Sequence, residues 1–455
     1  MKKPVKNYLD SLPISGKKML KKDLVALTPP MGFNSYDCYA TTANEKNILD
    51  NANYMAKNLL PFGYQYIVLD IQWSAKNSGS DPNKVYNDFE DLTLDEYGRE
   101  LPSIKKFPSS KGNQGFKPLA DKIHALGLQF GIHILRGIPR IACYLKLPVY
   151  GTNLTADQIA DPFSVSLWNA DMYGLKNIRE SQAYYDSIFK LYASWGVDFV
   201  KVDDIASNGL HPEDPYFTRY EVEMIRNAID KSGKDMVLSL SPGPTLIENA
   251  GHLEKYANMW RISNDFWDKW SDIKSMFSYC HTWEKEVSPG NYPDCDMLPV
   301  GKLCIGFKEN GKSKETTTRL SKDEQITMLT LWCIFNSPLM IGSDLPSLDS
   351  WTYKLLTNRD VLYLLGNTFD MREISHTEKE IIWSSKDKNN SNQYLALFNI
   401  SEEERVFNFQ LTKLGISKAD TYDCWSHIEL DKSTMEIKAR IKKHGAILLR
   451  LFNIK

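Results

Sequence analysis

Three short apolar runs in this chain each end abruptly in carboxylates. The clearest is Val197–Asp204, where β-branched residues lead into a lysine and two aspartates, and Tyr66–Asp70 and Met259–Asp265 follow the same pattern. A strand that is buried on both faces reads as a nearly continuous hydrophobic run, so acids at its end have no packing role. A helix-capping aspartate would explain a single case. Three cases favour parallel strands that share an acidic pocket at their carboxyl ends, as in an α/β barrel.

Such runs alternate with longer amphipathic segments from Thr28 onward, as expected for β/α units. We predict eight strands and place them at Met31–Tyr36, Gln65–Asp70, Gln129–Leu135, Phe199–Asp203, Met236–Ser241, Met259–Ser263, Asp296–Val300 and Cys333–Ile341. Helix-like stretches lie between them, at Ala43–Leu60, Phe116–Leu126, Gln182–Trp195, Tyr220–Lys231 and Ser321–Trp332. This alternation predicts a (β/α)8 TIM barrel over residues 28–364 rather than an open doubly wound sheet.

The texture of the sequence changes after Leu365. Short strand-like runs separated by polar turns follow, at Ile381–Ser384, Tyr394–Ile400, Arg405–Leu411, Asp420–Trp425, Met435–Ile441 and Ala446–Phe452. Closely spaced short strands predict an antiparallel β-sandwich domain at 365–455, and residues 1–27 then form an N-terminal extension. Residues 74–115 form a long polar insertion, and long loops at this end of a barrel usually build or cover the pocket.

Charge and composition exclude several kinds of partner. The formal net charge of −2 gives no reason to expect nucleic acid or an anionic membrane as a partner. Met1–Leu24 lacks the apolar core of a secretory signal, and no run approaches the roughly 20 apolar residues of a membrane span. The seven cysteines form no C-x-x-C pair, so we expect reduced thiols in a cytoplasmic protein without metal or cofactor. The sequence leaves homo-oligomerisation open.

The acids at the strand ends can act together. Hydrolysis of a glycosidic bond with retention uses two carboxyl groups about 5–5.5 Å apart, one ionised and one protonated. Barrel strands bring distant residues into one pocket, so Asp203 and Asp265 can meet there. Lys201 lies two residues before Asp203 on the same strand face, where its charge would keep Asp203 ionised. Arg261, four residues before Asp265, could bind substrate hydroxyls or orient an acid by paired hydrogen bonds.

Five ordered motifs run from residue 28 to residue 339. They are T-P-P-M-G-F-N-S-Y at 28–36, K-V-D at 201–203, R-I-S-N-D at 261–265, D-C-D-M-L at 294–298 and N-S-P-L at 336–339. In this order they resemble the motifs of glycoside hydrolase family 27, the α-galactosidase and α-N-acetylgalactosaminidase family. Phe33 and Tyr36 stand where the family usually has tryptophans, and Cys295 stands where it has a proline.

The resemblance implies a retaining exo-glycosidase that acts on a small oligosaccharide or glycoside. Asp203 would be the nucleophile and Asp265 the acid/base, with Asp204 outside the chemistry. The substrate would carry a terminal α-D-galactose or the stereochemically equivalent β-L-arabinopyranose.

Two departures from the family pattern concern the substrate. The second strand of α-galactosidases usually ends in two aspartates that hold the 4- and 6-hydroxyls of the sugar, but here the pair is Asp70-Ile71. An isoleucine accepts no hydrogen bond, which suits L-arabinopyranose because that sugar lacks the hydroxymethyl arm. The alternative is that Ile71 packs in the barrel wall. Ser241 stands where α-galactosidases read the 2-hydroxyl with a glutamate, so an α-N-acetylgalactosaminidase is a second candidate, unless Ser241 is only a turn residue.

Several single residues complete the set of candidate substrate contacts. For each of them core packing or a structural hydrogen bond is the competing interpretation. They are Phe33, Tyr36, Trp73, His133, Arg136, Trp168 and Asp296.

Two other classes of protein compete with the glycosidase hypothesis. A carbohydrate-binding barrel that has lost its chemistry would keep the fold, but the presence of both Asp203 and Asp265 argues against it. A metal-dependent barrel enzyme would use Asp70, Asp203, Asp204 and Asp296 as oxygen ligands. Insensitivity to a chelator would dismiss that alternative.

Overall fold

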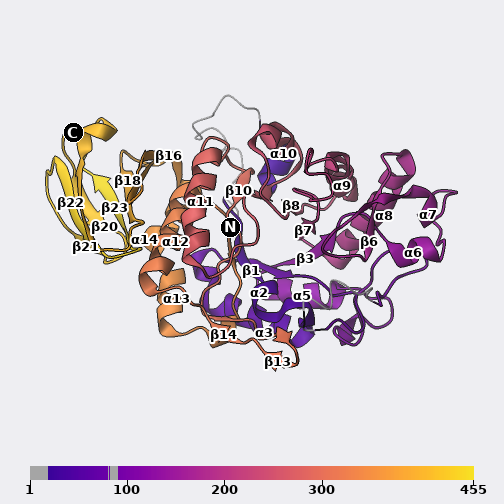
Figure 1. The fold of residues 1–455 in the computed structure, drawn as a ribbon. Helices are drawn as coiled ribbons and strands as arrows, with labels where there is room; N and C mark the ends of the chain where they lie inside the picture. The colour runs from indigo at the N-terminus through magenta and orange to yellow at the C-terminus, as the bar shows by residue number, and fades with distance from the viewer. Residues whose placement is uncertain (1–18, 80, 82–90) are drawn as a thin grey trace.

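Eight parallel strands form one curled sheet at the centre of the molecule (Figure 1). Its order is β10-β9-β8-β7-β3-β2-β1-β15, and every neighbouring pair is parallel. A parallel bridge between Leu298 and Ile341 connects the two ends of the sheet. The strands are β1 (Met31–Asn34), β2 (Tyr66–Leu69), β3 (Gln129–Leu135), β7 (Phe199–Asp203), β8 (Val237–Leu240), β9 (Met259–Arg261), β10 (Tyr292–Asp294) and β15 (Leu339–Ile341). The predicted TIM-like architecture is confirmed.

Helices separate successive strands and pack against the outside of the sheet. Most of them bury one face; in α3, Ile48, Ala52 and Met55 recur at helical spacing and are fully buried. Local sequence sets the helix ends, as where the left-handed Gly196 terminates α8. The helices are α3 (Glu45–Asn58), α5 (Lys117–Ala125), α8 (Arg179–Trp195), α9 (Arg219–Ser232), α10 (Ala250–Tyr256), α11 (Trp270–Trp283) and α12 (Lys322–Phe335), followed by the short α13 (Ser350–Leu356), α14 (Arg359–Leu362) and α15 (Leu364–Asn367).

The computed structural model describes residues 19–79, 81 and 91–455. Most of the predicted N-terminal extension, residues 1–18, lies outside this part of the chain, as do residues 80 and 82–90 of the predicted insertion. Within the described ranges, no helix combines the length and the apolar character that crossing a membrane requires. All seven cysteines are free thiols.

Two predicted strands are wrong in position. The seventh was expected at Asp296–Val300, but β10 ends at Asp294. The apolar run that follows is buried outside any strand, and the Leu298 backbone donates a hydrogen bond to Met340 of β15. The eighth was expected to begin at Cys333, yet α12 continues through Phe335. Because α12 is buried on nearly all sides, its last turn is as apolar as a strand and the helical period is hidden.

The C-terminal strands form the predicted antiparallel sandwich. A six-stranded sheet of order β16-β17-β18-β23-β20-β21 faces a β19–β22 pair. Side chains from the two sheets meet in a core that includes Leu395, Phe407, Phe409 and Leu449. The strands are β16 (Thr368–His376), β17 (Glu380–Asp387), β18 (Gln393–Asn399), β19 (Arg405–Gln410), β20 (Asp420–Asp423), β21 (Ile428–Glu429), β22 (Glu436–Ile441) and β23 (Ala446–Phe452).

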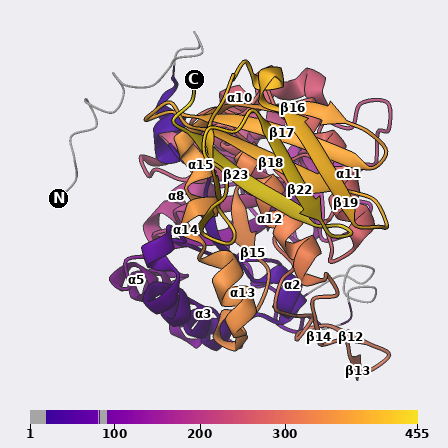
Figure 2. The ribbon, with the colours of Figure 1, turned by 90° about the vertical axis from the view of Figure 1, so that its left-hand side faces the viewer.

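Helix α12 joins the barrel to the sandwich. In Figure 2 it lies behind the C-terminal sheet, with the barrel on its far side. Phe335 packs edge-on against Trp383 of β17, and Trp425 donates a hydrogen bond to Thr330 at 2.9 Å. The same helix faces the barrel, where the Trp332 indole packs against Phe266. One hydrophobic core therefore extends from the barrel wall into the C-terminal domain.

Two excursions from the barrel supply residues near its carboxyl face. The first follows β3 and contains β4 (Ile138–Pro139), α6 (Arg140–Tyr144), α7 (Ala156–Ile159), β5 (Ala160–Val165) and β6 (Met172–Leu175). The second follows β10 and contains two small hairpin pairs, β11 (Lys302–Leu303) with β14 (Thr316–Thr317) and β12 (Lys308–Glu309) with β13 (Lys312–Ser313). After β1 the chain turns directly into the short α2 (Tyr36–Tyr39).

Candidate active site

A cavity of about 560 Å³ opens at the carboxyl ends of the barrel strands. Six strand ends contribute to it, together with one tryptophan from the excursion after β3. The lining residues are Tyr36, Asp37, Asp70, Ile71, Trp168, Lys201, Asp203, Pro242, Arg261, Asn264, Asp265, Phe266, Trp267, Asp296 and Met297. The acids of the three apolar runs therefore do share one pocket.

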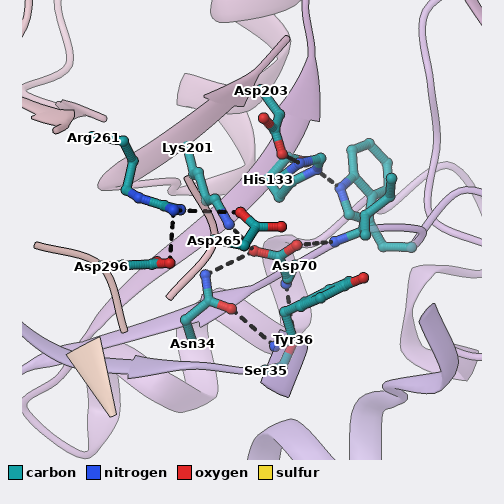
Figure 3. A network of polar contacts seen from close by, with 12 residues as sticks. Asn34, Ser35, Tyr36, Asp70, His133, Lys201, Asp203, Arg261, Asp265 and Asp296 are labelled. Carbon is teal, nitrogen blue, oxygen red and sulfur yellow. Dashed lines mark hydrogen bonds and ion pairs between the residues drawn. The ribbon is translucent and has the colours of Figure 1, made fainter. Parts of the chain in front are cut away.

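Asp70 is a fully paired carboxylate at the end of β2 (Figure 3). Its Oδ2 accepts hydrogen bonds from Asn34 at 2.8 Å and Lys201 at 2.9 Å, and its Oδ1 accepts one from the Ile71 backbone at 2.9 Å. Burial raises the pKa of Asp70, but Lys201, His133 and these hydrogen bonds outweigh burial and lower it below its usual range. Asp70 is thus held ionised as a hydrogen-bond acceptor.

Asp203, the last residue of β7, faces the cavity beside His133 of β3 (Figure 3). The distance from His133 Nε2 to Asp203 Oδ2 is 3.3 Å, and the Asp204 backbone donates to Asp203 Oδ1 at 2.9 Å. Burial raises the pKa of Asp203, yet the His133 hydrogen bond and charge, with Lys201, lower it far below its usual value. The carboxylate remains ionised, as a nucleophile requires.

Asp265 lies at the open side of the cavity, held by Arg261. Arg261 Nη2 is 3.3 Å from Asp265 Oδ1 and 2.7 Å from Asp296 Oδ2, so one buried guanidinium holds two carboxylates (Figure 3). The Asp265 side chain is 69% exposed, whereas those of Arg261 and Asp296 are 3% and 5% exposed. Asp296 also accepts a hydrogen bond from the Phe266 backbone at 2.8 Å, which fixes the loop that carries Asp265.

Ile71 lines the cavity next to Asp70 and is 5% exposed. The Asp70 carboxylate accepts the Ile71 backbone N–H. The Ile71 side chain thus adds an apolar surface to the cavity beside the ionised Asp70 carboxylate.

Five of the sequence-predicted contacts lie outside the lining of the cavity, and one of them, His133, meets it only through its hydrogen bond with Asp203. Phe33 is fully buried in β1, and Trp73 packs against Phe116 and Trp195 in the barrel core. Arg136 turns away to Asp204 at 3.0 Å and Glu221 at 3.1 Å.

The fifth is Ser241, which is 1% exposed and follows the last residue of β8. Its hydroxyl has no hydrogen-bond partner in the described part of the chain. Pro242, the next residue, lines the cavity in its place.

The carboxylates proposed as metal ligands in the alternative hypothesis are separated by their partners. Asp204 adopts a left-handed conformation (φ 60°), which an aspartate tolerates, and it pairs with Arg136, whereas Asp203 stays in the pocket. Asp70 pairs with Lys201 and Asp296 with Arg261. Across residues 19–79, 81 and 91–455, no group of three or more His, Cys, Asp or Glu side chains is arranged to hold a metal ion.

Sequence reasoning missed six lining residues. Each follows or flanks a predicted site residue, so position immediately after a strand end was the available signal. The missed residues are Asp37, Pro242, Asn264, Phe266, Trp267 and Met297. The described part of the 74–115 insertion supplies none of the lining, whereas Phe307 of the second excursion packs edge-on against both Tyr36 and Trp267.

Comparison with known proteins identifies relatives along the whole chain. The family model for α-galactosidase A matches residues 176–366, and that for the α-galactosidase C-terminal β-sandwich domain matches residues 378–451. A β-L-arabinopyranosidase from Geobacillus stearothermophilus is 45% identical, with a TM-score of 0.91, 95% of this chain covered and 98% of that chain covered. The chain belongs to glycoside hydrolase family 27.

Other relatives in family 27 carry different names. A putative α-N-acetylgalactosaminidase from Bacillus halodurans is 43% identical, with a TM-score of 0.83, over 93% of this chain and 97% of that one. α-Galactosidase 2 of Arabidopsis thaliana is 24% identical over 95% of this chain and 92% of its own length. The protein is therefore a glycoside hydrolase, and its substrate is a matter of the pocket rather than of the fold.

Proposed function

We propose that the protein is a retaining exo-glycosidase that removes terminal β-L-arabinopyranosyl residues in preference to α-D-galactosyl residues. Ile71 carries this preference, because it places an apolar side chain beside Asp70 in the cavity. The 45% identical relative, which is a β-L-arabinopyranosidase, supports the same substrate class.

In the first step the ionised Asp203 attacks the anomeric carbon of the bound sugar. A bond forms between its carboxylate oxygen and that carbon while the bond to the leaving oxygen breaks. Asp265 donates its proton to the leaving oxygen. The exposed position of Asp265 suits this role because the departing group must pass through the open side of the cavity.

In the second step Asp265, now a carboxylate, takes a proton from a water molecule. The water oxygen attacks the anomeric carbon and releases Asp203, so the sugar leaves with its original configuration. Arg261 stabilises Asp265 in its charged form between the two steps. Lys201 and Asp70 bind sugar hydroxyls, with Asp70 as acceptor and Lys201 as donor.

Specificity arises from the cost of an unmet hydrogen bond. A 6-hydroxyl of galactose placed against Ile71 would lose its water without gaining a partner, which costs roughly 1–3 kcal/mol. Arabinopyranose has no group at that position, so its ring can contact the isoleucine directly. The difference favours the arabinoside by a factor of about 10 to 100.

The test compares aryl β-L-arabinopyranoside, α-D-galactoside and α-N-acetylgalactosaminide side by side. We expect the highest kcat/KM for the arabinoside. Ile71→Asp should shift the relative transition-state binding free energy of the two sugars by about 2–4 kcal/mol towards the galactoside. Galactose gains a hydrogen-bond acceptor for its 6-hydroxyl, whereas arabinose leaves the new carboxylate without a hydrogen-bond partner.

Ile71→Leu is the matched control, since it keeps an apolar side chain of the same volume and should keep the preference. An active Ile71→Asp enzyme with the wild-type substrate ratio would refute the role of Ile71. If the N-acetylgalactosaminide were the best substrate of the wild type, the α-N-acetylgalactosaminidase alternative would replace the proposal.

A further inference from the structure

A second, much smaller cavity of about 20 Å³ lies beside His133, the hydrogen-bond partner of the proposed nucleophile. It shares only Ile71 with the lining of the sugar cavity. Its lining includes Gln72, Ser74, Glu100, His133 and Asp171. The volume suffices for one water molecule, and the polar lining would satisfy it.

The two chain segments outside the barrel repeat deliver the acids of this cavity. Glu100 comes from the insertion after β2 and accepts a hydrogen bond from Ser74 at 2.5 Å. Asp171 comes from the excursion after β3 and accepts one from Gln72 at 3.0 Å. The other side-chain atom of Gln72, Oε1, is buried and receives no hydrogen bond from the described residues. The cavity is thus a built polar site with hydrogen-bonding capacity to spare.

His133 stands between the two cavities. It is 2% exposed, its Nε2 lies 3.3 Å from Asp203, and the residue also lines the small cavity. The Trp73 indole donates to the His133 carbonyl at 2.6 Å, which ties the strand end to the barrel core. His133 therefore contacts Asp203 and also shares the small cavity with Glu100 and Asp171.

The charged groups around His133 come from every element packed against it. Asp70 ends β2, and Lys201 and Asp203 lie on β7, where Lys201 is the register partner of His133. Glu100 and Asp171 line the same small cavity as His133, and the charge of Glu100 interacts with His133. Burial raises the pKa of Glu100 to about 6, against the opposing influence of the Ser74 hydrogen bond and of His133.

We propose that His133 is a positioning residue for Asp203, and that Glu100 and Asp171 form its counter-charge across the small cavity. The ring would donate its Nε2 proton to Asp203 and hold the carboxylate ionised and aimed at the anomeric carbon. The two acids would orient the ring from behind through the cavity. The insertion would then influence the nucleophile through Glu100 and His133, without contacting the sugar.

This inference rests on the proposed role of Asp203 as nucleophile, and the test separates the two. The probe is an activated 2-deoxy-2-fluoro glycoside of the preferred sugar, which needs no proton from Asp265 and leaves a covalent label on the nucleophile. Peptide mapping of the labelled protein identifies the residue. A label on a residue other than Asp203 would overturn the proposed function itself.

With Asp203 as the labelled residue, His133→Phe should slow labelling at neutral pH by about 10- to 100-fold, because a hydrogen bond to a charged group is lost. Its acid limb should also move to higher pH by about one unit or more, since the pKa of Asp203 rises when the donor is removed. His133→Gln, which offers an N–H at a similar place, should recover most of the rate. A purely structural role would lower the amount of folded enzyme without moving the acid limb.

Glu100→Gln tests the counter-charge, with Glu96→Gln as the matched control because Glu96 is an exposed acid of the same insertion. Glu100→Gln should slow labelling by about 3- to 10-fold in the wild-type background. In the His133→Phe background the same substitution should leave the labelling rate unchanged, because Glu100 acts through the imidazole of His133. Glu96→Gln should label like the wild type.

Two results would overturn the inference while the proposed function stands. One is a His133→Phe enzyme that labels Asp203 at the wild-type rate with the wild-type acid limb. The other is a Glu100→Gln factor that is unchanged in the His133→Phe background. Thermal unfolding of each variant verifies that the comparison is made on folded protein.

Discussion

The two sides of the candidate active site, named here after the proposed nucleophile Asp203 and the proposed acid Asp265, differ in their exposure to solvent. The nucleophile side consists of Asp70, His133, Lys201 and Asp203, whose side chains are 2%, 2%, 14% and 16% exposed. On the acid side, Arg261 is equally buried, but its partner Asp265 is 69% exposed. The nucleophile side is a closed network of ion pairs and hydrogen bonds, whereas the acid side opens to solvent.

This difference in exposure matches the role that the proposed mechanism gives to each acid. A nucleophile must keep one charge state throughout, so buried cations and donors can fix it. An acid/base must lose a proton to the leaving group and regain one from water in every cycle. The contrast between the two sides is what the proposed double displacement requires, and it can be tested residue by residue.

The largest expected effect is at the centre of the nucleophile side. Asp203→Asn should lower turnover by about 10⁴-fold or more, because an amide cannot form the covalent intermediate. Steady-state rates on an aryl glycoside, with circular dichroism to verify the fold, measure it. Full activity in this variant would exclude Asp203 as the nucleophile, and the difference between the two sides would then have another cause.

On the acid side the expected effect depends on the leaving group. Asp265→Ala should cost about 10²- to 10⁴-fold on glycosides with poor leaving groups, which need a proton. Activated aryl glycosides should lose much less in the first step. The measurement is a plot of rate against leaving-group pKa, and equal losses across the series would contradict the acid/base assignment.

Stability should also distinguish the buried network from an exposed ion pair. Lys201→Met leaves the buried Asp70 carboxylate without its cation and should lower the free energy of unfolding by about 3–5 kcal/mol. Lys117→Met is the control, since Lys117 and its partner Asp121 are 55% and 57% exposed, and it should cost less than about 0.5 kcal/mol. Urea unfolding measures both, and similar losses would show that the closed network has no special weight.

The smallest expected effect is a lack of pH dependence. The pKa of Asp203 is lowered, so its ionised form is lost only as pH falls through a value well below that of an ordinary aspartate. In the Glu100→Gln variant, where the titration of Glu100 near pH 6 is removed, the rate of covalent labelling by an activated fluoro-glycoside should therefore change by less than about threefold between pH 7 and pH 5. A labelling midpoint inside this interval would contradict the closed, ionised state of the nucleophile side.

The barrel could be predicted from sequence wherever a strand is flanked by a clear change of pattern. Residues 129–135 and 199–203 were placed with the observed bounds, because polar segments delimit both runs. Both misplaced strands were predicted wrongly for the same reason. Leu298 and the last turn of α12 are buried, but neither lies in a strand. Apolar character reports burial, and burial alone does not distinguish a strand from its neighbours.

For the site, the sequence identified which residues meet but not how they pair. Lys201 was expected to act on Asp203 because both lie on one strand face, yet its ion pair is with Asp70 of another strand. Its charge reaches Asp203 only as one of several contributions. The partner of Arg136 was likewise hidden, because Glu221 lies on α9 and comes close only in the folded chain. Pairing across elements depends on register and twist, which local pattern does not encode.

Helix α12 also determines how the protein unfolds. Its side chains face the barrel on one side and the C-terminal sheet on the other, with no solvent-facing stripe between residues 327 and 335. A shortened chain ending before the sandwich would present Ile334, Phe335 and their neighbours to water, as a surface prone to aggregation. The chain should therefore lose both domains in one cooperative transition, and the sandwich is as necessary to a working catalyst as the strands that carry the acids.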